Sequence, residues 1–326
     1  MLYIRNENTN PYVNHAVEEY FMKNSREECF ILWRNVPCIL IGRNQNTVSE
    51  INIEFVKEHD IRIVRRLSGG GAVFNDLGNI NFTFITNKDE DSAINFKKFA
   101  QPIINALRDL GIDAEFSGRN DITIEGKKFS GNAQYYWKDR VLHHGTLLFS
   151  GNLTDLSAAL KTKPLKFEDK SVKSVASRVT NISRHLQQPM DVLEFREFLR
   201  EHVMKANDIE QVYELTAEDW GAIQQLADAR FSTWDWNFGS SPKYNLTNER
   251  RFAGGTVELN MEVDKGIIKA VKIYGDFFGE CDIAELEQAL LGIKHDEGEI
   301  RKALTGYEVE RYIANTSIDE LISCLF

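Results

Sequence analysis

The chain of 326 residues is long enough for two domains with hydrophobic cores, and its 42% hydrophobic and 27% charged residues are typical of a soluble globular protein. A net charge of −10 disfavours a general nucleic-acid-binding role. No apolar run approaches the roughly eighteen residues that a membrane-spanning helix needs, so we expect neither a membrane nor a nucleic-acid partner.

Four cysteines, Cys29, Cys38, Cys281 and Cys324, occur without a Cys-x-x-Cys pair and have mostly apolar neighbours. This pattern favours buried, reduced thiols over disulfides or a zinc site. Together with the lack of a long apolar run, it leads us to expect a cytoplasmic protein.

In chain order, the first predicted element is a helix that begins at Pro11. Asn10 is suited to cap it, and apolar residues recur at helical spacing over residues 13–21. Residues 30–33 and 38–41 are apolar runs on either side of a turn-forming segment. This arrangement predicts a hairpin of two buried strands.

A strand predicted over residues 61–66 ends in Arg65 and Arg66 and leads into three consecutive glycines, residues 69–71, before a further strand. Glycines lack a Cβ and accept positive φ, so the N–H groups of such a loop can surround a phosphate. A neighbouring arginine adds charge and a forked set of donors. For the loop alone, a flexible hairpin with solvated arginines is the alternative. Because a strand follows, the loop is not a dinucleotide-binding fingerprint, which opens a helix.

Residues 79–85 alternate like a strand, and residues 96–110 predict an amphipathic helix that packs on the sheet. A tight hairpin is then predicted over residues 122–129, around a Glu-Gly turn. Asp121 and Lys128 therefore come close together on neighbouring strands. The Asp121 carboxylate is an oxygen ligand of the kind that Mg²⁺ prefers. A turn aspartate that caps its own backbone and a solvated lysine are the alternatives.

Residues 141–149 predict a strand in which His143 and His144 point to opposite faces, so the two cannot bind one metal together. One of them could be a hydrogen-bond partner for a ligand, and a structural histidine is the alternative. Gly145 would let a ligand or another strand approach closely.

Five lysines between residues 161 and 173 predict a basic surface loop. Turn formers at residues 239–242 predict a domain boundary. The elements predicted beyond it are a hairpin and two helices, at residues 256–263, 267–273, 283–291 and 318–325. We therefore expect a catalytic domain over residues 1–242 and a small αβ domain over residues 246–326.

Four motifs occur in one order: Arg-Arg-x-Ser-Gly-Gly-Gly-Ala-Val-Phe, Gly-Arg-Asn-Asp, Lys-x-Ser-Gly-x-Ala and His-His-Gly-Thr-Leu-Leu. In this combination the sequence resembles the lipoate-protein ligases, through the catalytic domain and on into the carboxy-terminal domain. The resemblance implies an α/β (α+β) fold. Its catalytic domain would have a mixed sheet of the class II aminoacyl-tRNA synthetase and biotin protein ligase type, followed by a small αβ accessory domain.

The resemblance also implies a two-step reaction with ATP and Mg²⁺ as cofactors. Lipoate would first be activated to lipoyl-AMP with release of pyrophosphate. The lipoyl group would then pass to a lysine of a lipoyl domain of a 2-oxoacid dehydrogenase E2 subunit, or of the glycine-cleavage H protein. Lipoate or octanoate would be the acyl substrate.

Carried onto this chain, the family's positions assign Lys128 as the catalytic residue and Asp121 as the Mg²⁺ ligand. The positions expected to bind ATP are Arg66, Gly71, Ala72, Val73, Phe74 and Lys128. The positions expected to bind the acyl substrate are Ser68, Gly70, Lys128, His144 and Gly145. The floor of the acyl tunnel is expected from Ala72, Phe74, Ala133 and Leu147.

This chain departs from the family where Leu67 and residues 134–136 stand, because the family often has arginine there. Contacts to the acyl carboxylate are therefore not carried over.

Two functions other than the ligase stay open. An octanoyl or lipoyl acyltransferase of the same fold could use a cysteine nucleophile, but Cys29 and Cys38 lie in predicted apolar strands. A non-catalytic lipoyl-binding protein would not need Arg66, the glycines, Asp121 and Lys128 all at once.

Overall fold

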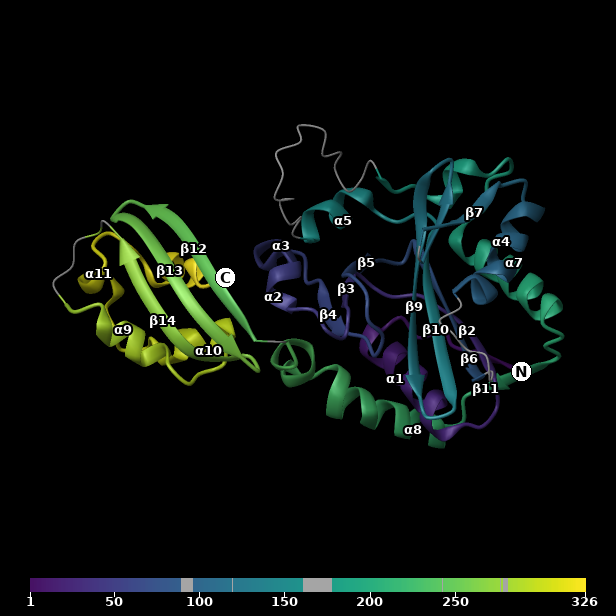
Figure 1. Ribbon diagram of the computed structural model, residues 1–326, viewed down its shortest axis with the longest axis horizontal. Coiled ribbons are helices and arrows are strands. Elements are labelled where there is room, and N and C mark those ends of the chain that lie inside the picture. Colours follow the sequence, from purple (N-terminus) through teal and green to yellow (C-terminus); the bar gives the residue numbers. More distant parts are fainter. Residues whose placement is uncertain (89–95, 119, 161–177, 242, 276, 278–280) are drawn as a thin grey trace. The chain divides into compact units, whose positions relative to one another are not determined.

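The computed structural model describes residues 1–88, 96–118, 120–160, 178–241, 243–275, 277 and 281–326. The described residues divide into two compact units (Figure 1). The N-terminal unit holds residues 1–43 and 50–233, and the C-terminal unit holds residues 44–49 and 234–326. The predicted basic loop over residues 161–173 and Arg119 of the Gly-Arg-Asn-Asp motif lie outside the described residues.

The N-terminal unit is built on an eight-stranded mixed sheet in the order β11-β1-β2-β6-β10-β9-β8-β7 (Figure 1). Its strands are β1 (Leu2–Arg5), β2 (Cys29–Trp33), β6 (Asn79–Asn87), β7 (Ala114–Ser117), β8 (Asp121–Ile124), β9 (Lys127–Trp137), β10 (Arg140–Leu148) and β11 (Gln211–Glu214). Its helices are α1 (Pro11–Asn24), α3 (Ile53–Glu58), α4 (Phe96–Asp109), α5 (Leu153–Ala159), α7 (Val192–Ala206) and α8 (Ala217–Leu226), with a short 3-10 helix η1 (Ile182–His185) and a short π-helix η2 (Ala227–Phe231). Strand β1 pairs in parallel with β2 and β11, and the other pairs are antiparallel.

The two faces of this sheet carry different side chains. On one face, the ring of Phe84 packs 5.9 Å from the ring of Phe99 of α4, and α7 lies beside α4. On the other face, Thr83 of β6 and His144 of β10 contact Glu18 of α1, and α8 packs on α1. The sheet thus has an aromatic core face and a polar face, as alternation along a strand requires. The predicted helix capped by Asn10 is confirmed, since the Asn10 side chain accepts from the N–H of residue 12.

A second sheet of three strands stands apart from the large one, in the order β4-β3-β5. Its strands are β3 (Cys38–Ile41), β4 (Arg62–Arg65) and β5 (Val73–Asn75). The predicted hairpin of residues 30–33 with 38–41 is therefore wrong, because β2 pairs with β1 and β6 while β3 pairs with β4 and β5. Pro37, directly before β3, has no N–H to give to a ladder, and the N–H of Val36 donates to the carbonyl of Thr9.

The C-terminal unit packs a three-stranded antiparallel sheet against short helices (Figure 1). Its elements are β12 (Tyr244–Phe252), β13 (Gly255–Asp264), β14 (Ile267–Gly275), α9 (Ala284–Leu290), α10 (Glu297–Ala303), α11 (Val309–Tyr312) and α12 (Ile318–Cys324), besides the short π-helix η3 (Asp235–Gly239) and the first three residues of α2 (Thr47–Glu50). The hairpin and the two helices predicted here are confirmed, whereas β12 was not predicted. Leu259 and Val263 of β13 are fully buried with Leu286 of α9 in its core.

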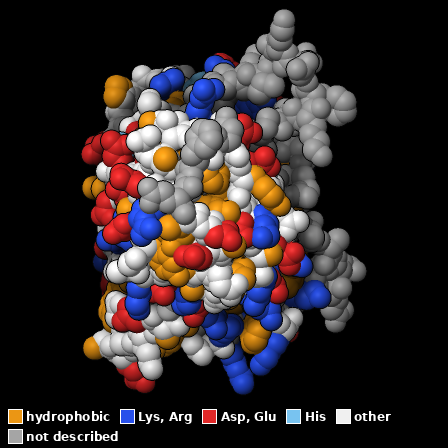
Figure 2. Space-filling view, turned by 90° about the vertical axis from the view of Figure 1, so that its left-hand side faces the viewer, with side chains coloured by type: hydrophobic (Ala, Val, Ile, Leu, Met, Phe, Trp, Pro, Cys, Tyr) orange, Lys and Arg blue, Asp and Glu red, His pale blue; other side chains and the backbone are white. Residues whose placement is uncertain are grey.

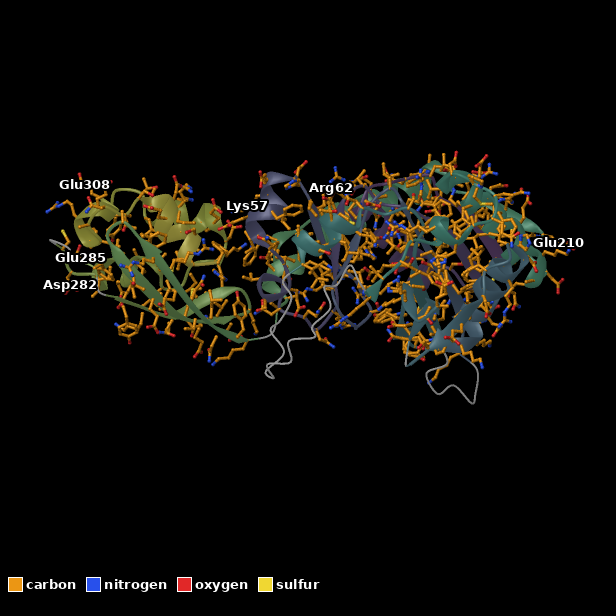
Figure 3. The ribbon with its side chains drawn as sticks, turned by 90° about the horizontal axis from the view of Figure 1, so that it is seen from above. Lys57, Arg62, Glu210, Asp282, Glu285 and Glu308 are labelled. Atoms are coloured by element: carbon orange, nitrogen blue, oxygen red, sulfur yellow. The ribbon has the colours of Figure 1, made fainter. Side chains whose placement is uncertain are left out.

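The surface of this unit carries mixed charges. Figure 2 shows Lys and Arg side chains interspersed with Asp and Glu and with hydrophobic side chains, and not one continuous field of either sign. Asp282, Glu285 and Glu308 lie at the same end of the unit (Figure 3). Within the described ranges, no helix of either unit is both long and apolar enough to cross a membrane.

His143 of β10 lies on the core face, with its ring stacked 4.7 Å from the ring of Phe99. Its Nε2–H donates to Asn132 Oδ1 and its Nδ1 accepts from Gln134 Nε2, both at 3.1 Å, so the neutral ring is fully paired. Burial, assisted by an electrostatic interaction with the neighbouring His144, holds the pKa of His143 well below its usual 6.5. The folded protein therefore resists protonation at this position.

This burial predicts how stability changes with pH. The unfolded chain takes up a proton at His143 below about pH 6.5 and the folded chain does not, so the free energy of unfolding should be flat above that pH and fall below it. Glutamine at this position can still donate and accept, so His143→Gln should flatten the slope. Urea unfolding at about pH 5 and about pH 7.5 measures both proteins. If the free energy of unfolding changed by the same amount between the two pH values in the natural protein and in His143→Gln, this account would be contradicted.

Candidate active site

The hairpin predicted around Glu-Gly is present, and it joins β8 to β9. Glu125 and Gly126 have φ of 51° and 73°, as a tight turn of this kind requires. Asp121 Oδ1 and Lys128 Nζ lie 2.8 Å apart, so their predicted proximity is confirmed. Both side chains are about a third to two fifths exposed, which leaves them accessible to a ligand.

A β-bulge sets the direction of Lys128. Ile122 pairs with Ser130, but the next residue of β8, Thr123, pairs with Lys128, so Phe129 is left without a partner residue. In regular alternation Lys128 and Gly131 would point to opposite faces. The extra residue turns Lys128 onto the polar face, and Phe129 is buried in the core.

An inner cavity lies on this polar face and crosses four strands. Trp33 of β2 is opposite Asn81 of β6, Asn81 is opposite Thr146 of β10, and the N–H of Gly131 on β9 meets the Thr146 hydroxyl. All four residues line the cavity, as does Lys128 at the β9 end. Three steps between neighbouring strands amount to roughly 14 Å. The cavity therefore has a far end at Trp33 and a reactive end at Lys128.

A larger outer cavity adjoins the first. Its volume is about 730 Å³, compared with about 130 Å³ for the inner cavity. Phe74, Asp121 and Arg178 are part of its wall. Lys128 lines both cavities, so its ammonium group can reach ligands in each.

Arg66 fixes the glycine loop through hydrogen bonds. Its guanidinium donates to the carbonyl oxygens of Leu40, Gly69 and Gly71 at 2.7–3.0 Å and to Ser68 Oγ at 3.2 Å. Burial lowers the pKa of Arg66 to about 10, with a smaller opposing effect of Glu18. The arginine is only 5% exposed, and its hydrogen bonds to the loop carbonyls fix the conformation of the loop whose N–H groups are predicted to meet phosphate. Gly70 has φ of +96°, which only glycine adopts without strain.

A buried carboxylate that the sequence did not single out organises the polar face. Glu18 of α1 accepts hydrogen bonds from Thr83 Oγ1 at 2.7 Å and from the Nδ1 atoms of His144 and His15 at 2.8 Å each. His144 Nε2 then accepts from Ser68 Oγ at 2.6 Å. The signal for this site is the pair of polar residues at positions 15 and 18, three apart within the apolar part of the first helix.

The structure brings most predicted site residues to the two cavities. The inner cavity is lined by Gly70, Gly71, Ala72, Val73, Lys128, Ala133, His144 and Gly145, together with Arg66, and the outer one by Ala72, Val73, Phe74, Asp121 and Lys128. Ser68 is buried behind His144. The predicted tunnel role of Leu147 is wrong, since this residue alternates onto the core face. Phe74 faces the outer cavity instead of the inner one.

Ala133 offers a direct test of the inner cavity. Ala133→Leu adds three carbon atoms to a side chain that lines it. For the substrates that the sequence resemblance implies, we expect the KM for lipoate to rise at least tenfold while the KM for ATP stays within about twofold. Lipoate-dependent pyrophosphate release measures both constants. Leu147→Met, a volume-conserving change on the core face, is the control. An unchanged KM for lipoate in Ala133→Leu would mean that the acyl chain lies elsewhere.

Comparison with protein families identifies both parts of the chain. Residues 10–204 match the lipoyl protein ligase A/B catalytic domain, and residues 241–325 match the bacterial lipoate protein ligase C-terminus. The chain is 46% identical to lipoate-protein ligase LplJ of Bacillus subtilis, over all of both chains. It is 43% identical to lipoate–protein ligase 1 of Staphylococcus aureus, over 99% of each. The chain belongs to the lipoate-protein ligase family, which confirms the resemblance noted in its sequence.

Solved structures agree with this assignment. A bipartite lipoate protein ligase from Thermoplasma acidophilum, studied with its E2 lipoyl domain, is 29% identical with a TM-score of 0.66, over 73% of this chain and 96% of that one. LipL1 of P. falciparum in complex with lipoate is 27% identical with a TM-score of 0.63, over 99% and 98%. A lipoate-protein ligase A bound with ATP is 26% identical with a TM-score of 0.65, over 73% and 98%. The mixed-sheet fold predicted for the catalytic domain is thereby confirmed.

Proposed function

We propose that this ligase joins lipoate to AMP at Lys128, with lipoate in the inner cavity and ATP in the outer one. The observation that carries the proposal is that Lys128 lines both cavities. The relative crystallised with lipoate and the one bound with ATP support the choice of ligands. Ala72 and Val73, which line both cavities, and Gly71, which lines the inner one, would meet the phosphates.

In the first step, a carboxylate oxygen of lipoate attacks the α-phosphorus, and the bond to pyrophosphate breaks. Two anions must approach each other, so fixed positive charge and N–H donors lower the barrier most. Lys128 supplies the charge at the meeting point, and the loop held by Arg66 supplies the donors. In the second step, the amine of an acceptor lysine attacks the acyl carbonyl and AMP leaves.

Mg²⁺ fits this site as a companion of the triphosphate. No cluster of three or more His, Cys, Asp or Glu side chains in the described part of the chain is arranged to hold an ion alone. An ion carried in by ATP needs only one or two carboxylates and keeps several waters. Asp121, exposed at the outer cavity, would hold it, and the bound ion would neutralise the leaving pyrophosphate.

The acceptor is proposed to be a lipoyl domain of an E2 subunit or the glycine-cleavage H protein. The Thermoplasma acidophilum relative, which was studied with an E2 lipoyl domain, supports the first. We place the protein in the cytoplasm, where ATP is available and where the four free cysteines would stay reduced. We also propose the C-terminal residues 246–326 as the accessory domain.

A cysteine-dependent acyltransferase is the second candidate function. The burial of both cysteines of the N-terminal unit, Cys29 and Cys38, disfavours it. Burial raises the pKa of Cys29 to about 11 and raises that of Cys38 further still. A thiol held protonated in this way is a poor nucleophile. Neither cysteine lines the inner or the outer cavity.

Intact mass spectrometry of an apo lipoyl domain or apo H protein tests the proposal. The acceptor is incubated with this protein, lipoate and MgATP, beside a reaction without ATP and one with Lys128→Ala. A mass gain of one lipoyl group that needs both ATP and Lys128 supports the ligase. Acylation from octanoyl-carrier protein without ATP would support the transferase instead. Lipoate-dependent thermal stabilisation without pyrophosphate would indicate a non-catalytic binder.

A further inference from the structure

We infer that Gly131 is a positioning residue for Lys128, because the absence of a side chain at Gly131 leaves the space in which the ammonium group lies between the inner and the outer cavity. Gly131 lines both cavities, as Lys128 does. The inference rests on the proposed function, in which Lys128 acts where the two cavities meet, and adds a residue on which that action depends.

The β-bulge of β9 brings the two residues together. In a regular strand Lys128 and Gly131 would point to opposite faces, and the extra residue places both on the polar face. A Cβ with ideal geometry at Gly131 would lie 3.1 Å from Lys128 Nζ and 3.2 Å from Lys128 Cε. Both distances are shorter than the roughly 3.5–4.0 Å of a favourable contact. The end of the lysine side chain thus lies directly against the bare Gly131.

This close approach is specific to the lysine. Apart from Gly131 and its two chain neighbours, Nζ and Cε of Lys128 are the only described atoms within 4 Å of that Cβ position. Two other glycines of the inner cavity differ. A Cβ at Gly70 would meet Arg66 at 2.9 Å, and a Cβ at Gly71 would meet no described atom within 4 Å. A side chain at position 131 would therefore act on the ammonium group of Lys128.

The backbone around Lys128 is held in place, so it cannot shift to relieve such a contact. The N–H of Thr180 donates to the carbonyl of Lys128 at 2.9 Å, and Lys128 is paired with Thr123 of β8. Gly131 does not have a positive φ, so alanine fits its backbone conformation without strain. The flexible end of Lys128 would move instead, and Nζ would leave its position 2.8 Å from Asp121 Oδ1.

Gly131→Ala is expected to lower kcat for lipoate-dependent pyrophosphate release at least tenfold, because small displacements of a reacting group are costly. The KM values for lipoate and ATP should stay within about threefold. In a protein that already carries Lys128→Ala, the same substitution should change kcat by less than about twofold, since it acts through Lys128. Gly221→Ala on α8, where a Cβ would meet no described atom within 4 Å, is the matched control and should keep the natural kcat.

A natural kcat in folded Gly131→Ala would overturn the inference, and so would a change confined to KM. An equal loss of kcat with and without Lys128 would also overturn it, because Gly131 would then act on the ligands directly. If Gly131→Ala does not fold, thermal unfolding of the double variant decides: a folded double variant supports the contact with Lys128, and an unfolded one contradicts it. Failure of the proposed function has a different signature, since Lys128→Ala alone would then keep near-normal pyrophosphate release.

Discussion

Lys128→Ala is expected to lower lipoate-dependent pyrophosphate release by about 10²–10³-fold, because it removes the positive charge where the carboxylate meets the α-phosphate. The protein should fold normally. The ion pair with Asp121 is substantially exposed, and pairs of that kind contribute about 1 kcal/mol or less to stability.

Two companion variants separate charge from geometry at this position. Lys128→Arg keeps the charge but places a planar fork where the cavities require a compact ammonium group, so most of the loss should remain. Lys205→Ala, an exposed residue of α7, is the control and should keep full activity. Thermal unfolding of each variant checks that it is folded. Near-normal pyrophosphate release by a folded Lys128→Ala protein would remove Lys128 from the mechanism.

Glu18→Ala is expected to destabilise the N-terminal unit by about 3–5 kcal/mol, the usual cost of removing one side of a buried charged network. The substitution leaves the buried Nδ1–H groups of His15 and His144 and the Thr83 hydroxyl without their acceptor. Glu18→Gln keeps the shape and one acceptor oxygen, so its cost should be smaller. Urea unfolding at about pH 7 measures the difference, with the exposed Glu201→Ala within about 0.5 kcal/mol of the natural protein.

The pH dependence of this cost is a second readout. Burial alone would raise the pKa of Glu18, but the interactions with His144 and His15, hydrogen bonds among them, outweigh burial and hold the pKa well below its usual 4.5. A group of this kind stabilises the fold above its unfolded pKa, and that contribution is lost as pH falls toward the folded pKa. The difference between Glu18→Ala and the natural protein should therefore shrink below about pH 4.5. A difference that is constant from about pH 7 to about pH 3.5 would contradict this assignment.

The sequence predicted local elements well where one signal dominated. Asn10 before Pro11 marked the start of α1, and Glu-Gly marked the turn between β8 and β9. The sequence-based prediction failed where the position of a strand depends on which other strand it pairs with. The apolar runs of β2 and β3 are as suited to a hairpin as to two separate sheets, and only the pairing with β6 and β4 distinguishes them. Strand β12 was missed because it is largely polar and alternates without strong apolar residues.

The site shows the same division. Lys128 and His144 reach the cavities because β9 and β10 are neighbours in the large sheet, and Gly71 reaches them from the loop between β4 and β5 of the second sheet. The face of the sheet toward which Lys128 points depends on a β-bulge, and the residue types at that position do not predict one. Glu18 joins the network from a helix more than a hundred residues away from His144. Contacts of this range follow from packing and are not contained in local spacing.

The inner cavity lies across strands β2, β6, β10 and β9 and not along one of them. Its length is therefore set mainly by strand-to-strand steps of roughly 4.8 Å each. A substitution can fill or free part of one step, and the next step past β2 would lie over β1, which is the neighbour of β2 in the sheet. The order of strands thus sets the length scale of the cavity, and we expect a cavity that ends at Trp33 to exclude fatty acids much longer than eight carbons.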